Sequence, residues 1–379
     1  HRKFFLSYVA PVLWNIAQIV VLVFVFIGSW EISDAATAAA WGMVAGGFLQ
    51  FGVQIAGVWK VAPDLRPNFK KSLPAVTDIR KRFFPAVMGR GVVQISAYVD
   101  LFLASLLTTG AVAALLSAQV LYLLPISLFV MSVAASELPE MSRERKFEEL
   151  TDRANAAIQK SLFFIFFSAA IYLSVGEQII NAFFGWGSFS SDDAIAVWIV
   201  LSAYSLGLPA IAASRLIQNT CWSLGDTKGP ARIAGVRVLV ALGVGLALMF
   251  PLDLITVSAG TLTTDEAPGP HLGAVGLALG SAFASWIEVS LLSRLVQKSL
   301  PEVMPLKKQV MKFGVPAALT LLLAAVIKLP TDNFHALLSA PIIIGVSALF
   351  YTVFSFRSGI RESDLILRPL RRFIYRLIN

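Results

Sequence analysis

Residues 161–184, SLFFIFFSAAIYLSVGEQIINAFF, form a 24-residue stretch with one charged side chain, Glu177. An apolar run of this length matches a helix that crosses the ~30 Å hydrocarbon core of a bilayer, which takes about 20 residues. Five Lys and Arg residues precede the stretch in 143–160, whereas the acidic pair Asp192 and Asp193 follows it. The stretch therefore predicts a membrane span with a cationic side and an acidic side.

Nine further apolar segments have a similar length. Only helices or closed barrels satisfy the backbone hydrogen bonds in lipid. The strand alternation of a barrel is absent, and the runs are about twice as long as barrel strands. The fold class is therefore all-α, a polytopic membrane protein with about ten transmembrane helices, the others lying near 4–28, 36–59, 83–108, 111–136, 194–221, 233–252, 272–297, 310–328 and 338–356.

The positive charges are sorted by alternate connections. Of the 31 Lys and Arg residues, 28 lie on one side of the spans if the N-terminus is placed in the cytoplasm, and only Arg90, Arg215 and Lys328 remain. Because Lys and Arg accumulate on the cytoplasmic side of membrane proteins, both termini are predicted to be cytoplasmic. The connections that carry the cations are Arg2–Lys3, 60–82, 143–160, 228–237, 294–312 and 357–376.

Composition limits the functions that remain. The net charge of +8 sits in short connections between spans, which favours anionic lipid headgroups as partners and argues against nucleic acid. The single cysteine, Cys221, excludes an internal disulfide and a cysteine-based metal cluster. No nucleotide-binding loop, HExxH motif or nucleophile with a suitably spaced base occurs, so we expect no enzyme activity, cofactor or metal.

An internal repeat runs through the chain. Gly42, Gly46, Gln54 and Lys60 align with Gly276, Gly280, Glu288 and Arg294 at a constant offset of 234 positions, and Pro11 aligns with Pro230 at an offset of 219. Both copies run in the same direction through the membrane. Parallel repeats of this kind are typical of transporters with two lobes.

Charged and polar residues inside the spans are the candidate site, because the bilayer makes them costly. Arg90, Gln94 and Asp100 share one flank of the third span. This flank is interpreted as the wall of a wet cavity, where the guanidinium of Arg90 meets an anionic headgroup. An internal Arg–Asp ion pair and a snorkelling arginine are the alternatives.

Further candidates lie in other spans. Glu288 is either a protonatable cavity group or a capped polar contact, and Gln119 lies mid-membrane in the span that contains Pro125. Asn15 follows Pro11 by one turn, where a kink with a local hydrogen bond is the structural alternative. Arg215 is predicted to snorkel and Glu177 to be solvated.

One run of motifs resembles a known family. The run is Gln94-Ile-Ser-Ala-Tyr-Val-Asp100, then Gly110-Ala-Val, Tyr122-Leu-Leu-Pro125 and Leu138-Pro139-Glu-Met-Ser142, with Gly185-Trp-Gly187 and Gly225-Asp226-Thr227 further on. It resembles the MurJ (MviN) family of lipid II flippases in the MOP exporter superfamily.

The resemblance implies a two-lobe fold of fourteen spans, of which this chain would hold the last ten. Because it begins at His1, we expect it to be a fragment of a longer protein that lacks the N-terminal helices. The implied organisation is the end of the first lobe in 1–60, a basic cytoplasmic linker in 61–82 and the second lobe of six spans in 83–300. Two extra spans in 301–356 and a basic cytoplasmic tail in 357–379 complete it.

The implied function is movement of a lipid-linked peptidoglycan precursor, an anionic oligosaccharide lipid, from the inner to the outer leaflet of the bacterial cytoplasmic membrane by alternating access. A coupling ion or the membrane potential would drive it. Val120 replaces an arginine frequent in relatives, and Trp186 stands where an arginine is usual. Residues 238–248 hold no Asn or Asp, which argues against a sodium site at Asp100. Another MOP exporter (a polysaccharide-repeat flippase or a cation-coupled drug exporter) and a non-transporting scaffold for cell-wall assembly stay open.

Overall fold

The computed structural model describes residues 5–61, 98–144, 146–264, 269–303, 305–331 and 336–367; within these ranges the side chains of 5–9, 61, 138, 139, 142 and 331 are not described. The chain forms two compact units, unit 1 from His1 to Arg82 and unit 2 from Phe83 to Asn379. Within the described residues, nine helices are long and apolar enough to cross a membrane, which confirms an all-α polytopic membrane protein.

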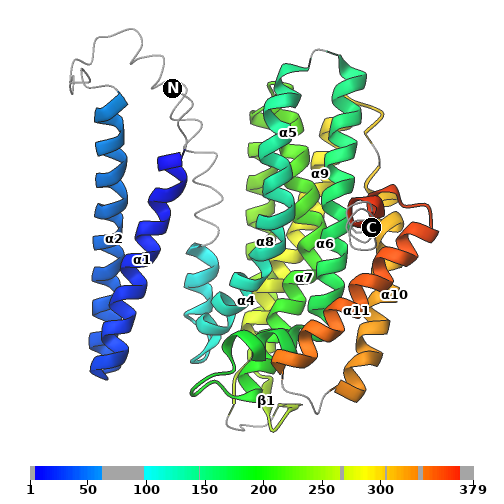
Figure 1. Cartoon of the computed structure of the whole chain (residues 1–379). Coiled ribbons are helices and arrows are strands. Elements are labelled where there is room, and N and C mark those ends of the chain that lie inside the picture. Colours follow the sequence, from blue (N-terminus) through cyan, green and yellow to red (C-terminus); the bar gives the residue numbers. More distant parts are fainter. Residues whose placement is uncertain are drawn as a thin grey trace, which may run out of the picture. The chain divides into compact units, whose positions relative to one another are not determined.

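Unit 1 contains the antiparallel helices α1 (Phe5–Gly28) and α2 (Ile32–Val61), which pack on each other (Figure 1). Glycines set their distance. A Cβ added at Gly46 would lie 3.0 Å from the backbone oxygen of Trp14, and one at Gly42 would lie 3.0 Å from the side chain of Val21. Since any larger side chain would force the helices apart, these glycines are required by the close approach.

The core of unit 2 consists of three long helices, α6 (Phe147–Phe184), α7 (Ser191–Ser223) and α9 (Gly273–Gln297), which are largely buried. Helix α7 starts with a capping box, in which Ser190 and Asp193 exchange hydrogen bonds. Helix α6 begins 14 residues before the predicted span at 161, because the charged segment before it continues the same helix.

Helix α8 (Lys228–Asp253) packs mainly on α9 and leaves most of its surface unburied in unit 2. The Asp226 carboxylate accepts a hydrogen bond from the Gly229 backbone N–H at 2.8 Å and so caps the start of α8. A Cβ added at Gly280 would lie 2.7 Å from the Gly245 backbone nitrogen, so α8 and α9 also meet through glycine.

The glycine contacts test the internal repeat. In both copies the matched glycines face the preceding helix, as the repeat predicts. The alignment of Pro11 with Pro230 is wrong in register, however. Gly42 faces Val21, which is 10 residues after Pro11, whereas Gly276 faces Leu248 and Met249, which are 18 and 19 residues after Pro230.

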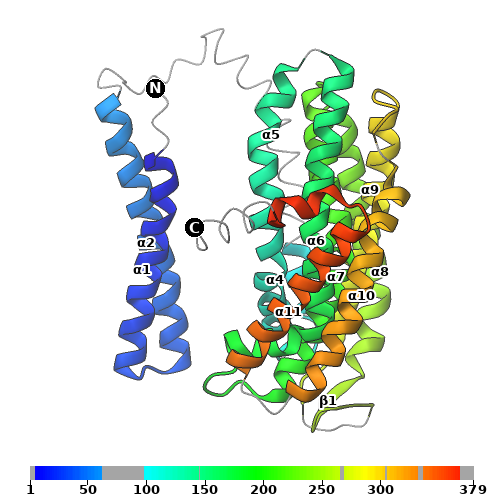
Figure 2. The ribbon, with the colours of Figure 1, turned by 45° about the vertical axis from the view of Figure 1, so that its right-hand side comes forward.

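A small antiparallel hairpin follows α8 and was not expected from the sequence. Strands β1 (Thr256–Ser258) and β2 (Thr261–Thr263) pair with Val257 opposite Leu262. The Asp192 carboxylate at the start of α7 accepts hydrogen bonds from the backbone N–H groups of Ala259 and Gly260, at 3.1 and 2.8 Å. The hairpin lies at the opposite end of unit 2 from the connection between α5 and α6 (Figures 1 and 2).

The fourth predicted span, 111–136, is a continuous helix with a π-helical segment inside it. It consists of α4 (Ala111–Pro125), the π-helical η1 (Ile126–Met131) and α5 (Ser132–Arg143). Pro125 has no N–H, so the carbonyl of Leu121 loses its helical donor. The hydroxyl of Tyr172 on α6 donates to that carbonyl at 2.7 Å, and Ser161 donates to the carbonyl of Phe129 in η1 at 3.3 Å. Side chains from α6 therefore cover the backbone groups that the proline and the π-turn expose.

Two further helices, α10 (Leu306–Thr331) and α11 (Ala336–Arg357), pack against α6, as Figures 1 and 2 both show. A short 3₁₀ turn, η2 (Arg361–Ser363), follows α11. The ammonium of Lys312 on α10 joins Gln159 on α6, at 2.7 Å, to Glu362, at 2.9 Å. Of the predicted third span, 83–108, only 98–108 falls within the described residues, and 98–104 is helical.

Candidate functional site

Glu288 is the most deeply buried carboxylate of the candidate site. It lies on α9 with 2% of its side chain exposed, and its Oε1 accepts a hydrogen bond from Gln218 Nε2 on α7 at 3.0 Å. Its Oε2 lies 3.6 Å from Nε of Arg237 on α8. Three helices therefore meet at one carboxylate.

The helix register explains this meeting. Arg237 comes nine residues after the start of α8 at Lys228, and Glu288 comes nine residues before the end of α9 at Gln297. At 1.5 Å per residue, both lie about 13 Å from the helix ends. Because α8 and α9 are antiparallel neighbours, the two side chains reach the same depth in the helix bundle.

Arg215 adds a second guanidinium from α7. It interacts electrostatically with Glu288, Arg237 and Tyr122, and its Nε is buried with no hydrogen-bond acceptor among the described residues. A snorkelling side chain would carry its polar atoms toward water. The Nε of Arg215 is therefore buried inside unit 2, and snorkelling of its terminal nitrogens stays a prediction.

Two predicted residues join the same region. Gln119 Nε2 on α4 donates to the hydroxyl of Tyr204 on α7 at 3.0 Å, and the rings of Tyr204 and Tyr122 lie 4.9 Å apart. Asp100 is half-buried and interacts electrostatically with Arg237. We define the polar cluster as Asp100, Gln119, Tyr122, Tyr204, Arg215, Gln218, Arg237 and Glu288.

The sequence predicted three members of the polar cluster, Asp100, Gln119 and Glu288. It missed Arg237, which had been counted with the cytoplasmic cations although it falls inside the predicted span 233–252. The signal that could have found Arg237 is its depth. It lies nine residues from the start of α8, and Glu288 lies nine residues from the end of α9. An intramembrane cation usually lies beside an acidic partner at the same depth.

The remaining predicted residues do not enter the polar cluster as described. Arg90 and Gln94 lie outside the described residues. Asn15 lies on α1 in unit 1 and is exposed. Among the described residues, no group of three or more His, Cys, Asp or Glu side chains is placed to hold a metal ion.

Lys328 and Glu177 form a separate ion pair. Lys328 Nζ on α10 lies 2.7 Å from Glu177 Oε2 on α6, and it also lies 5.2 Å from the centre of the Trp198 ring. The sequence did not predict this partner for Glu177, whose side chain stays 24% exposed beside the ammonium of Lys328. The ion pair also explains why Lys328 can lie on the side of the membrane that has few Lys and Arg residues.

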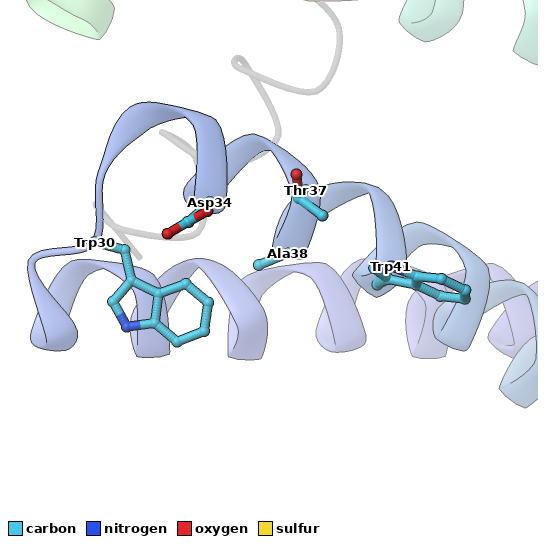
Figure 3. Close-up of a pocket in the computed structure, with 5 residues that line it drawn as sticks. All are labelled: Trp30, Asp34, Thr37, Ala38 and Trp41. Carbon is cyan, nitrogen blue, oxygen red and sulfur yellow. The ribbon is translucent and has the colours of Figure 1, made fainter.

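Unit 1 has an open cleft of about 580 Å³ at the turn between α1 and α2. In Figure 3, Trp30 and Asp34 lie at one end of this cleft and Trp41 at the other, with Thr37 and Ala38 between them. Exposed tryptophans near a helix turn are typical of the membrane–water interface. None of the predicted site residues lines it.

Unit 2 has an apolar groove of about 430 Å³ between α4, α6 and α11. Leu121 and Leu124 form one wall, and Tyr172 lies in the α6 wall, where its hydroxyl reaches the carbonyl of Leu121. The α11 wall contains Pro341 and Ile344. This groove has the dimensions and the apolar lining that suit a hydrocarbon chain.

Long apolar helices around a cluster of charged and polar side chains define a polytopic α-helical membrane protein. The family model described as "Lipid II flippase MurJ" matches residues 1–344. The chain therefore belongs to the MurJ lipid II flippase family.

Individual proteins agree with this assignment. The chain is 28% identical over 300 residues to a probable lipid II flippase MurJ of Rhizobium meliloti, covering 77% of this chain and 51% of that protein. A Thermotoga maritima protein of the same description is 24% identical over 368 residues, covering 97% of this chain and 68% of that one. The chain thus spans about half the length of curated relatives such as those of Rhizobium.

A solved structure has the same fold. It is described as lipid II flippase MurJ in an inward closed conformation, and it superposes with a TM-score of 0.74 at 24% identity, covering 97% of this chain and 68% of that one. The match supports the expected transporter fold and says nothing about the ligand.

Proposed function

We propose that the protein is a flippase that moves lipid II, the lipid-linked peptidoglycan precursor, from the inner to the outer leaflet by alternating access. The observation that carries the proposal is the polar cluster, which lies among apolar helices of a chain that belongs to the MurJ family. A diphosphate and its sugars need hydrated, polar and cationic surroundings inside the membrane, and such residues are costly unless they are used.

The headgroup would contact the polar cluster. Arg237 and Arg215 supply positive charge, and Gln119 and Asp100 supply hydrogen bonds for sugars or for a hydrated path. Arg90 and Gln94 stay predicted headgroup contacts on the third span, and Asn15 stays a predicted contact on α1. The arginines make an anionic cargo a better match than the cationic drugs of the related exporters.

The lipid tail would use the apolar groove between α4, α6 and α11. Its lining of Leu, Ile, Phe and Ala side chains can hold part of a polyprenyl chain while the remainder stays in the bilayer. Because α10 and α11 both pack on α6, the two C-terminal spans would form a wall for this tail.

We further propose the bacterial cytoplasmic membrane as the location, with both termini in the cytoplasm, on the basis of the sorted cations. The membrane potential can drive a charged cargo, since it supplies ~2.3 kcal/mol per elementary charge for each 100 mV. A coupling ion is the other proposed source of energy.

The experiment is translocation in vesicles. The full-length protein is reconstituted into liposomes with a fluorescent lipid II analogue, and a membrane-impermeant quencher reports the headgroups that reach the outer leaflet under an imposed potential. We expect faster translocation than in protein-free liposomes and a loss of about tenfold or more in Arg90→Ala, since hydrogen bonds to charged groups contribute about that factor. The matched control is Arg232→Ala, an exposed cation on α8.

The outcomes separate the candidates. Translocation no faster than in protein-free liposomes would overturn the flippase and favour the scaffold for cell-wall assembly. Export of a cationic dye in place of the lipid would favour the drug exporter. Transport of another undecaprenyl-linked oligosaccharide at a higher rate than lipid II would favour the polysaccharide-repeat flippase.

A further inference from the structure

We propose that Arg215 and Arg237 form a binding site for a phosphate group, and that Glu288, the ion-pair partner of Arg237, competes with the phosphate for that guanidinium. This inference rests on the proposed function and deepens it, because it assigns the anionic part of the cargo to two residues of unit 2. The site consists of one side chain each from α7, α8 and α9.

The first argument is that the guanidiniums have unused hydrogen-bonding capacity. Arg237 Nε lies 3.6 Å from Glu288 Oε2, which is longer than a hydrogen bond between nitrogen and oxygen. Nε of Arg215 is buried and has no acceptor among the described residues. A buried donor without an acceptor costs free energy, so an acceptor beside Nε of Arg215 is favoured.

The second argument is a comparison with the structural ion pair of the same unit. Lys328 and Glu177 meet at 2.7 Å, a distance at which charge and hydrogen bond act together. The Arg237–Glu288 pair is buried more deeply on its carboxylate side, where a close hydrogen bond would contribute most, yet it is almost 1 Å longer. If the ion pair only stabilised the fold, we would expect Arg237 Nε and Glu288 Oε2 to lie within hydrogen-bond distance.

The third argument concerns the carboxylate. Glu288 keeps a hydrogen bond from Gln218 at 3.0 Å that does not involve either arginine. When a phosphate takes over the guanidiniums, the carboxylate therefore still has a donor. This arrangement lowers the cost of exchanging the carboxylate for a phosphate at Arg237.

The fourth argument concerns access and chemistry. The side chain of Arg237 is 22% exposed while that of Glu288 is 2% exposed, so a ligand can reach the guanidinium with the carboxylate behind it. The planar donor fork of arginine matches the oxygens of phosphate, and two forks match a diphosphate or a single phosphate held from two sides. Electrostatic interactions join Arg237 to Asp100 and Glu288, and Arg215 to Glu288.

The test is ligand binding by the full-length protein in detergent, measured by native mass spectrometry and by the shift of the thermal midpoint. Three probes are compared: undecaprenyl diphosphate, undecaprenol, which has the same tail without phosphate, and inorganic pyrophosphate. The variants are Arg215→Gln, Arg237→Gln and Glu288→Gln. The matched control is Arg232→Gln, which removes one exposed cation from the same helix as Arg237.

We expect Arg215→Gln and Arg237→Gln each to weaken undecaprenyl diphosphate binding by about tenfold or more, the usual effect of losing a hydrogen bond to a charged group. Arg232→Gln should bind as the wild type does, and no variant should alter undecaprenol binding. Glu288→Gln should bind the diphosphate more tightly, because the competing carboxylate is gone. Arg237→Lys should retain part of the affinity, since it keeps the charge but loses the fork.

Several results would overturn the proposal. Unchanged diphosphate binding in both arginine variants would do so, as would equal losses for undecaprenol. Weaker binding in a folded Glu288→Gln variant would show that the carboxylate supports the site and does not compete for it. Pyrophosphate binding that follows the same variants supports the phosphate site and identifies the free anion as a ligand.

Failure of the proposed function is distinguished by a separate readout. If wild-type protein translocates no lipid II in vesicles but the arginine variants still lose diphosphate binding, the phosphate site stands and the flippase does not. If wild-type protein translocates lipid II and the arginine variants bind normally, only the phosphate site is wrong.

Discussion

The helix pairs α1–α2 and α8–α9 are copies of one architectural element with different chemistry. Both pairs meet through glycines, Gly42 and Gly46 in the first and Gly276 and Gly280 in the second. Helix α1 contains no charged residue, whereas α8 carries Arg237 in its third turn, opposite Glu288 of α9. The position that holds Glu288 in the second copy holds Gln54 in the first.

This difference indicates that the glycine contacts between the helices and the charged residues on them do not depend on each other. Glycine is needed wherever the helix backbones approach closely, so it occurs in both copies. Charge is costly inside a membrane and occurs in the copy where a ligand or a partner stabilises it. The asymmetry between the copies is therefore a better guide to the functional site than their similarity.

The largest effect is expected from removing the carboxylate that only the second copy has. Glu288→Ala leaves Arg237 without its buried ion-pair partner, and breaking a buried ion pair costs about 3–5 kcal/mol. The free energy of unfolding, measured in detergent with a denaturant series, should fall accordingly. Gln54→Ala is the matched control and should cost clearly less, because a neutral amide leaves no charge behind. Equal losses would remove the distinction between the copies.

The glycine contacts should give the next largest effect. Gly280→Ala places a Cβ 2.7 Å from the Gly245 backbone nitrogen, so α8 and α9 must separate. Overpacking of this kind costs about 1–3 kcal/mol. Gly46→Ala in the first copy should cost less, because the nearest backbone atoms, O and Cα of Trp14, lie 3.0 and 3.1 Å away, farther than the backbone atoms that face Gly280.

A control for the glycine experiment is Gly243→Ala on α8, where no atom lies within 4 Å of the added Cβ. It should stabilise the helix by about 0.5–1 kcal/mol, the usual preference for Ala over Gly inside a helix. Thermal midpoints of the three variants, read by the loss of helical circular dichroism, test the order. A Gly280→Ala protein as stable as wild type would show that the close approach is not needed.

Removing the hydrogen bond beside Pro125 should lower the free energy of unfolding by no more than Gly280→Ala does, and it tests what a backbone carbonyl without a donor costs in this fold. Tyr172→Phe removes the hydroxyl that covers the Leu121 carbonyl, at a cost of about 1–3 kcal/mol for a buried acceptor left without a donor. Tyr98→Phe, at an exposed position, is the control. The same midpoint measurement applies. If Tyr172→Phe is neutral, the groove must admit water to that carbonyl.

The smallest effect is expected at the ion pair of Lys328 and Glu177. A double-mutant cycle with Lys328→Met and Glu177→Gln should give a coupling energy of about 1 kcal/mol, because both side chains keep some exposure to water. Diphosphate binding should be unchanged in both single variants. A loss of binding in either would place this pair in the ligand path and weaken the contrast with the polar cluster.

The sequence predicted the spans well because hydrophobicity is a local property. Its boundaries were least accurate where polar residues continue a helix out of the membrane, as in α6, which begins at Phe147. Side-chain partners were predicted poorly. The sequence did not predict that Arg215 interacts with Glu288 or that Glu177 pairs with Lys328, 151 positions away.

The sequence by itself determined the all-α class, the membrane location of the helices and three members of the polar cluster, because the cost of burying charge in lipid depends on the residue and its run of neighbours. Only the tertiary structure decided that Arg237 meets Glu288, that Arg215 keeps a spare donor and that Tyr172 covers the carbonyl freed by Pro125. These contacts join residues on different helices, and helix rotation and register are set by packing, which no local pattern specifies.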